Sequence, residues 1–306
     1  MPTRGRPLKP RQLAAVVLLL ITSLAISACG QSGNDAASPA SADTLATQNA
    51  ETPATNAQPP ATTTWYQPNV DTTWQWQLQG PLNTTYQVDL YDIDLFETSA
   101  QTIAELQANG IRVICYFSAG SGEDWRADYP SIPNDALGRA LAGFDGERWL
   151  DIRSPAVLAV MQSRLDLAAS KGCDGVEPDN VDGHDNDTGF SLTANDLLIF
   201  NQQLPREAHQ RGLAIGLKNA LDLIPQLVDD FDFAVNEECH TNDECDANLP
   251  FIDAGKPVFN AEYTNTATRA QERLLTICPT SNDLQLQTLV LPLDLDDSFR
   301  LTCPPS

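Results

Sequence analysis

The sequence has few basic residues, few histidines and almost no methionine. It holds 18 Lys+Arg against 41 Asp+Glu, with 3 His and 2 Met in 306 residues, and its formal net charge is −23. Because binding of a phosphate backbone needs basic patches, this balance argues against a nucleic-acid partner. The histidines show no ligand spacing, so we predict no metal site and disfavour a metal-dependent deacetylase.

Sequence motifs for nucleotide binding, metalloproteolysis and serine hydrolysis are also absent. The chain has no G-x-G-x-x-G at the start of a helix, no Walker sequence, no H-E-x-x-H and no G-x-S-x-G. It has no internal repeat either. We therefore expect a protein that works without a cofactor.

The N-terminus has the pattern of an export signal. Four basic residues between positions 4 and 11 precede an apolar run at 13–24, which is too short to span a membrane comfortably. Residues 26–29 (ISAC) resemble a bacterial lipobox. This resemblance implies cleavage before Cys29 and a lipid on its thiol, which would hold an exported protein on a bacterial membrane, facing the periplasm or the exterior. An ordinary signal peptide with an incidental cysteine is the alternative.

Residues 30–64 contain almost no bulky apolar side chain and are rich in Ala, Thr, Ser, Asn, Gln and Pro. Such a segment cannot bury enough surface to offset its ordering entropy, so we predict a disordered tether. The predicted organisation is a signal peptide at 1–28, the lipidated cysteine and tether at 29–64, and one folded domain at 65–306. We expect a monomer.

Loss of the leader makes the chain more acidic still. The leader holds 4 of the 18 basic residues and no acid, so the mature chain has 14 Lys+Arg against 41 Asp+Glu, a net charge of −27. Long-range attraction would suit a cationic ligand. A solubilising acidic surface on an exported protein explains the same charge equally well.

Six cysteines follow Cys29, and an even number in an exported protein indicates disulfides. The pairing we predict, one among the 15 that six cysteines allow, is Cys115–Cys173, Cys239–Cys245 and Cys278–Cys303. The second pair closes a small loop, the third pins the C-terminal tail, and the first is left by elimination. A zinc site is the rival interpretation, but no CxxC is present and only His240 adjoins a cysteine.

Strand-like and helix-like segments alternate through the folded part. Extended segments are expected at 73–78, 86–91, 111–117, 174–177, 213–217, 231–236, 257–261 and 286–292, and helices at 98–109, 154–171, 193–211, 220–229 and 266–277. Eight strands with helices between them indicate an α/β fold with a parallel sheet, and eight is the number that closes a (β/α)8 TIM barrel. A doubly wound open sheet is the structural rival.

Polar residues recur at the ends of these strands, most densely in 174–182 (DGVEPDNVD). Glu177 and Asp179 have the same parity, so they face the same side of an extended strand. Pro178 cannot donate to a ladder, so regular pairing should end there. Polar groups at one end of nearly every strand are typical of a barrel active site. Two carboxylates from different strands can hydrolyse a glycosidic bond.

Five separated motifs resemble those of glycoside hydrolase family 114. They are DID at 92–94, YFSAG at 116–120, GCDGVEPDNVDG at 172–183, GLKN at 216–219 and NEEC at 236–239. The similarity covers roughly residues 65–303. It implies a TIM-barrel endo-α-1,4-polygalactosaminidase, which cuts a galactosamine exopolysaccharide that is cationic where deacetylated, with retention of configuration.

The resemblance also implies roles for individual residues. Asp179, in the PDN run, is the expected nucleophile, and Glu237, in the NEEC run, is the expected acid/base. Candidate substrate contacts or groups that tune a pKa are Asp92, Tyr116, Ser118, Glu177, Asp182, Lys218, Asn219, Glu262 and Tyr263. A structural ion pair at the barrel rim is the alternative for Lys218.

Two choices between neighbouring acids stay open on sequence alone. Glu237 and Glu238 point to opposite faces of a strand, so one faces the barrel mouth, and we favour Glu237. Glu177 competes with Asp179, which lies closer to the strand tip and is favoured. The acidic loop 182–189 lacks the EF-hand order of ligands, so a solvated turn is favoured over a calcium site.

Two other functions remain compatible with the sequence. One is a non-catalytic carbohydrate-binding lipoprotein with the same barrel, although both acids of the candidate pair are present. The other is a hydrolase of another amino-sugar polymer or of a neutral α-linked glycan, because loop details determine the choice of substrate.

Overall fold

The computed structural model of the chain describes residues 65–304. The predicted signal peptide, Cys29 and the predicted tether lie outside the described residues, so those expectations stay predictions. Within the described part, no helix combines the length and the apolar character needed to cross a membrane.

Nine strands form one sheet in the order β1-β2-β3-β7-β8-β9-β10-β11-β12. The first eight of these are parallel neighbours, and β12 is antiparallel to β11. Their bounds are β1 (Trp74–Gln77), β2 (Leu90–Asp94), β3 (Arg112–Ser118), β7 (Gly175–Asp179), β8 (Ala214–Lys218), β9 (Phe233–Glu237), β10 (Val258–Thr264), β11 (Gln287–Pro292) and β12 (Leu301–Thr302).

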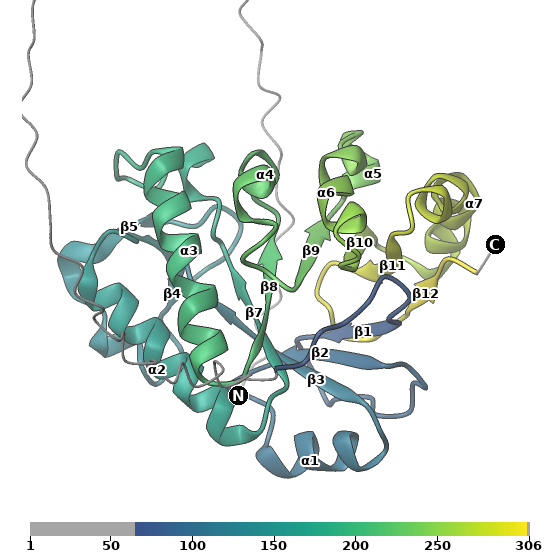
Figure 1. Cartoon of the computed structure of the whole chain (residues 1–306), viewed down its shortest axis with the longest axis horizontal. Coiled ribbons are helices and arrows are strands. Elements are labelled where there is room, and N and C mark those ends of the chain that lie inside the picture. The colour runs from purple at the N-terminus through teal and green to yellow at the C-terminus, as the bar shows by residue number, and fades with distance from the viewer. Residues whose placement is uncertain (1–64, 305–306) are drawn as a thin grey trace, which may run out of the picture. The chain divides into compact units, whose positions relative to one another are not determined.

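The helices lie on the outside of the curved sheet (Figure 1). They are α1 (Ala100–Ala108), α2 (Pro155–Lys171), α3 (Ala194–Gln210), α4 (Ile224–Leu227), α5 (Cys239–Asn242), α6 (Leu249–Asp253) and α7 (Ala267–Asp283). Local signals set their ends. Thr193 forms a capping box with Asp196 at the start of α3, and Gly172 ends α2 in the left-handed region at φ 87°.

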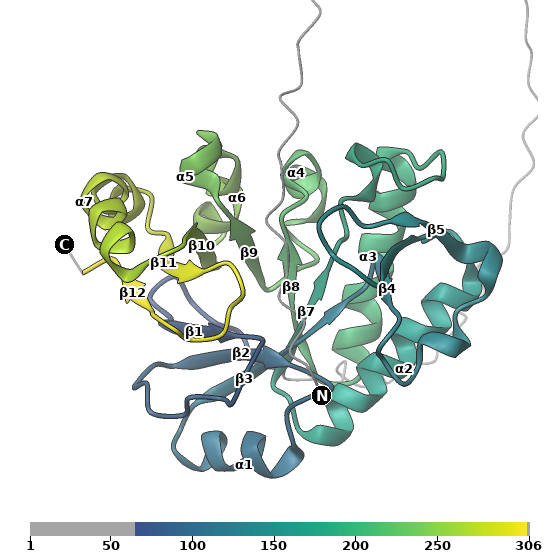
Figure 2. The ribbon, with the colours of Figure 1, turned by 180° about the vertical axis from the view of Figure 1, so that it is seen from behind.

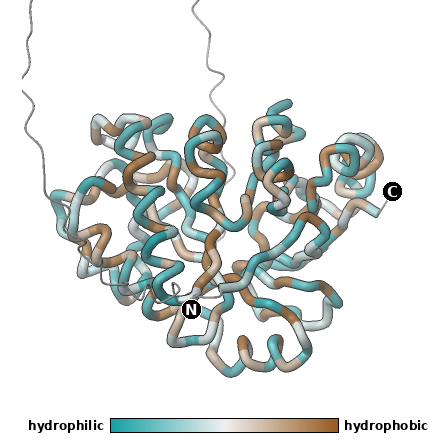
Figure 3. The backbone as a smooth tube through the Cα atoms, viewed as in Figure 1, coloured by the Kyte–Doolittle hydropathy of each residue, from teal (hydrophilic) through white to brown (hydrophobic). Residues whose placement is uncertain are grey.

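The parallel strands curl into a barrel because alternate residues of each strand point to a common interior. Trp74, Tyr116, Phe233 and Phe259 belong to one buried cluster inside the sheet. The other face of the sheet packs against the helices in a second cluster, to which Val176 belongs. The tube in Figure 3 is accordingly brown along the central strands. Two buried apolar layers are what a (β/α)8 barrel requires, and the predicted fold class is confirmed.

The seam of the barrel lies between β1 and β11, and side chains and a loop bridge it. The Trp74 ring lies 5.0 Å from that of Phe259, and Trp74 Nε1 donates to the Gln287 carbonyl at 2.8 Å. The backbone N–H groups of Leu78 and Gln79 both donate to the Leu295 carbonyl. These contacts stand where a continuous ladder would otherwise join the first and last parallel strands.

The second strand begins later than its sequence pattern predicts. Residues 86–91 were expected to be extended, but β2 starts at Leu90. The preceding loop satisfies its backbone through side chains: the Asn83 N–H donates to Gln77 Oε1, and the Tyr86 N–H donates to the Tyr91 hydroxyl. An alternating pattern therefore did not become a strand, since no neighbouring strand pairs with it.

Pro178 ends regular pairing on one side of β7 only. The register between β7 and β3 continues through Pro178 to Asp179, whereas the register between β7 and β8 stops at Val176. The prediction that pairing ends at the proline is therefore wrong toward β3. Pro178 lacks only the N–H group that would have donated toward β8, so its pairing with β3 is not affected.

A small antiparallel sheet, which the sequence analysis missed, follows β3. It consists of β4 (Ser121–Glu123), β6 (Glu147–Leu150) and β5 (Leu137–Ala140), in that order. Figure 2 shows it on the same side of the barrel as α2. Strands this short give almost no alternating pattern, so their pairing is decided by tertiary contacts. Backbone bonds from Ala119 and Gly120 to the Asp179 carbonyl join the start of this insertion to the end of β7.

The three predicted disulfides are all present. Cys115–Cys173 joins β3 to the segment before β7, Cys239–Cys245 closes the loop after β9, and Cys278–Cys303 ties α7 to the segment after β12. The predicted pairing is therefore confirmed. Each bridge removes conformational freedom from the unfolded chain, and the 58-residue separation of the first gives it the largest expected effect.

Candidate active site

Inward-pointing polar side chains gather at the carboxyl ends of the parallel strands. They continue the parity of the barrel interior, so each lies two or four residues beyond an inward-facing residue of the same strand. The set comprises Asp92 from β2, Tyr116 and Ser118 from β3, Glu177 and Asp179 from β7, Lys218 from β8, Glu237 from β9 and Tyr263 from β10. All parallel strands end at the same rim, so one site collects groups far apart in sequence.

Asp179 sits at the tip of β7 among hydrogen-bond donors. Its Oδ2 accepts from the Tyr116 hydroxyl at 3.0 Å, and its Oδ1 accepts from the Asn180 N–H at 2.6 Å. Lys218 Nζ lies 3.5 Å from the same Oδ1. The side chain is 19% exposed, so it is held firmly yet can be reached from the mouth. Three donors therefore surround this carboxylate.

Glu237 sits at the tip of β9 and reaches the same rim. Its Oε1 accepts from the Tyr263 hydroxyl at 2.5 Å, and its Oε2 accepts from Asn219 Nδ2 at 3.1 Å. Its side chain is 30% exposed, more than that of Asp179. The next residue, Glu238, leaves the strand in the left-handed region at φ 60°. Glu237, which sequence parity favoured, is therefore the residue placed among the inward-facing site groups.

The buried Lys218 lies close to both Asp179 and Glu237. Its Nζ lies 3.5 Å from Asp179 Oδ1 and 3.7 Å from Glu237 Oε2. Because both oxygens lie around one nitrogen, these two oxygens are at most about 7 Å apart, a limit that includes the 5–5.5 Å separation of retaining glycosidases. The ammonium also lies 4.6 Å from the centroid of the Trp76 ring, a cation–π contact in the interior.

The carboxyl group of Glu177 lies deeper in the barrel than those of Asp179 and Glu237. It is completely buried, and its Oε1 accepts from Lys218 Nζ at 2.7 Å. Burial raises the pKa of Glu177 to about 7 although the Lys218 charge opposes this. Burial, followed by the charge of Glu177, also holds the pKa of Asp92 well above its usual range. For Lys218, burial lowers the pKa, but the charges of Asp179, Glu177 and Glu237 outweigh it and the pKa is raised.

The predicted substrate contacts divide into reachable and buried groups. Asn219, Tyr263 and Asp182 are partly exposed, so they remain candidates, and Tyr116 is 5% exposed at the rim. Asp92, Ser118, Glu177, Lys218 and Glu262 are at most 1% exposed. Direct contact between these five side chains and a substrate is therefore not supported, and they act through the groups that they hold.

The prediction that Glu262 contacts the substrate is not supported by its position in the fold. Its parity on β10 is opposite to that of Tyr263, so it points to the helix side of the sheet. Its carboxylate accepts from the His240 N–H, the Thr241 hydroxyl and Arg273, at 2.9, 2.8 and 2.8 Å. These bonds fasten α5, the helix that follows Glu237. Glu262 is a support for the loop rather than a substrate contact, and strand parity alone could have shown this.

Comparison with known proteins was made on this background. A sequence model of the glycoside-hydrolase family GH114 matches residues 55–305, nearly all of the chain beyond the predicted tether. The chain belongs to glycoside hydrolase family 114. The resemblance inferred from its motifs is confirmed, and so is the class of enzyme: the protein is a glycoside hydrolase. No curated protein matched the chain.

Two solved structures show how the family fold recurs. Ega3 of Aspergillus fumigatus, solved in complex with galactosamine, is 42% identical, and the alignment covers 79% of this chain and 99% of Ega3 with a TM-score of 0.75. The glycoside hydrolase domain of PelA from Pseudomonas aeruginosa is 16% identical, with coverages of 74% and 96% and a TM-score of 0.60. At that identity PelA supports the fold alone.

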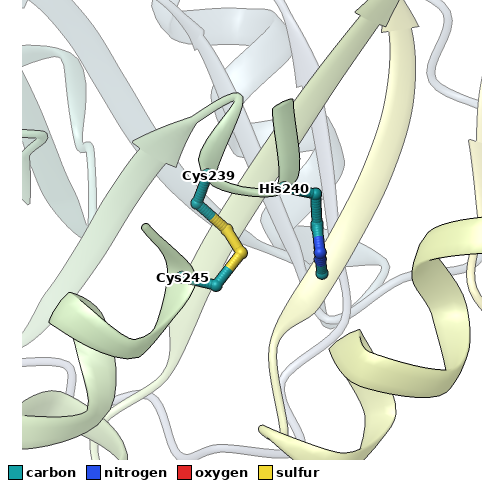
Figure 4. A group of neighbouring side chains, drawn as sticks. All are labelled: Cys239, His240 and Cys245. Atoms are coloured by element: carbon teal, nitrogen blue, oxygen red, sulfur yellow. A yellow bond between two sulfur atoms is a disulfide. The ribbon is translucent and has the colours of Figure 1, made fainter. Parts of the chain in front are cut away.

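The loop after Glu237 is closed by a disulfide in this family 114 protein. Figure 4 shows the sulfur atoms of Cys239 and Cys245 joined, with the His240 ring standing beside them. These three residues lie close enough to form a metal-binding group, but two thiolates are not available while they are bonded to each other. The bridge is therefore a structural support next to Glu237.

A second histidine cluster lies in the acidic loop after β7. His184 Nε2 is 2.9 Å from Asp222 Oδ2 and 3.6 Å from Asp185 Oδ2. Asp222 comes from the loop after β8, so this pair ties two neighbouring rim loops together. The contact between His184 and Asp222, which lies 38 residues further along the chain, was not predicted from the sequence.

The backbone of Asp179 and Asn180 is held by the glycine-rich turn after β3. Ala119 and Gly120 both donate to the Asp179 carbonyl, and Asn180 Nδ2 donates to Ser118 Oγ at 2.9 Å. A Cβ on Gly120 would lie 1.7 Å from the Asn180 carbonyl oxygen. Only glycine allows this approach. The contact between this turn and the end of β7 was not visible in the sequence.

We predict that Gly120→Ala displaces Asp179 and lowers kcat/KM by at least about 100-fold, since a shift of about 1 Å in a reacting group has such an effect. Thermal unfolding would show whether the variant remains folded. Gly183→Ala is the matched control, because its Cβ would meet ordinary contacts, the nearest at 3.4 Å. Wild-type activity in Gly120→Ala would show that the close approach does not position Asp179.

Proposed function

We propose that the protein is an endo-acting, retaining hydrolase of α-1,4-linked galactosamine polymers. The observation that carries the proposal is the convergence of Asp179 and Glu237 on Lys218 at the barrel mouth. Support for the substrate comes from Ega3, a 42% identical relative that was solved with galactosamine. A net charge of −27 for the predicted mature chain also favours attraction of a cationic polymer.

Asp179 suits the role of nucleophile. Its three donors stabilise the carboxylate, and the ionised oxygen can attack the anomeric carbon as the bond to the leaving oxygen breaks. Glu177, the competing acid, is fully buried and cannot reach a sugar.

Glu237 suits the role of acid/base because it is the more exposed of the pair and reaches the mouth from β9, two strands away from Asp179 on β7. In the first step it gives its proton to the leaving oxygen, and the sugar becomes bonded to Asp179. In the second step Glu237 takes a proton from water, whose hydroxyl displaces Asp179 from the anomeric carbon. The sum is hydrolysis with retention, and both carboxyl groups return to their starting state.

A cavity lies at the rim near the ends of β1 and β2, and none of the proposed catalytic acids lines it. It has a volume of about 270 Å³ and lies between the β1–β2 loop and the start of α1, with Asp94 and Glu97 in its wall. Asp94 is paired with Arg126 at 2.6 Å, while the Glu97 side chain is 79% exposed. We propose that this cavity, with the exposed carboxylate of Glu97 in its wall, receives part of a longer cationic chain.

We predict that Asp179→Asn and Glu237→Gln each lower turnover by about 100-fold or more while the protein remains folded, because each removes a carboxyl group from the reaction. Reducing ends released from a galactosamine polymer measure turnover, and circular dichroism monitors the fold. Glu238→Gln is the matched control and should retain most activity.

The same assay has a stereochemical readout. NMR of the first products should show the α-anomer before mutarotation, since two displacements retain configuration. Azide should restore turnover to a variant in which Asp179 is replaced by Ala. Near-normal turnover in both acid variants would refute the assignment, and a β-anomer as first product would refute retention.

We predict that deacetylated α-1,4-galactosamine polymer is shortened faster than its fully N-acetylated form, and that salt narrows the difference. Free amines are cationic at neutral pH, and salt screens their attraction to an acidic protein. Size-exclusion chromatography of both polymers at two salt concentrations gives the measurement. Equal rates at low salt would remove the electrostatic argument. Binding of the polymer without shortening would favour a non-catalytic carbohydrate-binding protein. Cleavage of another α-linked glycan, but not of galactosamine polymer, would favour a hydrolase with that substrate.

Export and membrane attachment through Cys29 remain proposals based on the N-terminal pattern. We predict that bacteria expressing the chain incorporate labelled palmitate into the protein and retain it in the membrane fraction. Cys29→Ser should abolish both, since it removes the thiol that a lipobox exposes to acylation. Unchanged membrane retention in Cys29→Ser would leave an ordinary signal peptide, or another form of attachment, as the explanation.

A further inference from the structure

Two carboxyl groups inside the barrel face each other without an intervening cation. Asp92 and Glu177 are both essentially unexposed and in hydrogen-bond contact. Asp92 Oδ1 and Glu177 Oε2 are buried, and no described residue donates a hydrogen bond to either atom. Two ionised carboxylates are acceptors only, so they cannot hydrogen-bond to each other. A hydrogen bond between them requires one proton.

The position of Lys218 decides which group holds that proton. Its Nζ lies 2.7 Å from Glu177 Oε1, and the next carboxylates within 4 Å are those of Asp179 and Glu237. The ammonium favours the ionised form of the group that it touches, which is Glu177. Asp92 has no such ion pair among the described residues, and the charged groups that face it are Glu177, Asp179 and Lys218. Ionising Asp92 would add a buried anion beside two others.

We propose that Asp92 is a neutral acid in the working enzyme, donates its proton to Glu177, and thereby positions Lys218 between Asp179 and Glu237. The proposal rests on the proposed function only in its catalytic consequence. Lys218 has three N–H donors, and three carboxylates surround it at 2.7, 3.5 and 3.7 Å. Because Asp92 donates to the second oxygen of Glu177, the Lys218 ammonium can direct its other N–H groups to one oxygen each of Asp179 and Glu237.

The elevated pKa values agree with this arrangement. Burial and then the Glu177 charge keep the pKa of Asp92 well above its usual value of 3.8, and burial raises the pKa of Glu177 from 4.5 to about 7. The folded protein therefore holds a proton that the unfolded chain releases. The resulting stability is fully present below about pH 4, falls as the pH rises above that, and is lost once the pH has passed the folded-state pKa values, of which that of Glu177 is about 7.

Infrared spectroscopy tests the proton directly and needs no substrate. At pH 8, above the pKa of about 7 of Glu177, the wild type should show the carbonyl stretch of a buried protonated carboxylic acid, and Asp92→Asn should lack that band. Asp89→Asn is the control, because Asp89 is exposed and precedes the same strand. A wild-type spectrum without the band, or an unchanged band in Asp92→Asn, would place the proton elsewhere and overturn the proposal.

Unfolding by urea between pH 4 and 8 gives a second readout. An amide mimics the protonated acid but releases no proton, so Asp92→Asn should gain stability relative to wild type as the pH rises. Within the titration range the ratio of the two unfolding constants should change by up to tenfold per pH unit, the limit for one proton. Parallel curves for the two proteins would contradict the proposal.

The catalytic consequence is tested by comparing two substitutions. Asp92→Asn can still donate to Glu177, so its kcat/KM should stay within a few-fold of wild type and fall less steeply at alkaline pH. Asp92→Leu cannot donate, and its kcat/KM should drop by about tenfold or more, the effect of a lost bond to a charged group. Equal loss in both would refute the positioning role. If the wild type cuts no galactosamine polymer, the proposed function is refuted. The infrared and unfolding results would still show whether Asp92 holds a proton.

Discussion

The ammonium group of Lys218 is a positive charge in the interior of a barrel, where an unpaired ion would cost several kcal/mol. It is stable there because three carboxylates and the face of Trp76 surround it. The same contacts bring Asp179 from β7 and Glu237 from β9 to within about 7 Å of each other. Removal of the lysine would leave the fully buried carboxyl group of Glu177 without its cation, so the geometry of the two proposed catalytic acids and the neutralisation of the interior depend on the same residue.

The rim loops hold the reacting acids against this fixed charge. The turn at Gly120 grips the backbone of Asp179, and Glu262 fastens α5 behind Glu237. The Cys239–Cys245 bridge closes the loop beside the same acid. These supports lie outside the space that a sugar can occupy. The barrel therefore holds the side chains of Asp179 and Glu237 close together, although 58 residues and a complete α/β unit separate them in the sequence.

Much of this arrangement follows from local patterns in the sequence. Strand parity places Glu177 and Asp179 on the same face and allows only one of Glu237 and Glu238 to face the mouth, and the same rule would have excluded Glu262 as a substrate contact. The short strands β4, β5 and β6 gave no usable pattern because three or four residues do not define a period. The early part of the segment 86–91 showed a period but had no partner strand. Contacts such as Gly120 with Asn180 or His184 with Asp222 depend on which loops meet, and one sequence does not contain that information.

The site also separates two tasks by depth. Asp92, Glu177 and Lys218 are dry, so their charges are constant over the course of a reaction and their mutual attraction is not weakened by water. Asp179 and Glu237 are partly exposed and are the groups that can exchange protons and bonds with a substrate. A cationic sugar entering the mouth meets Asp179 and Glu237 before it meets Lys218. The lysine can therefore neutralise buried acids without repelling an ammonium group of the substrate, because the two carboxylates lie between them.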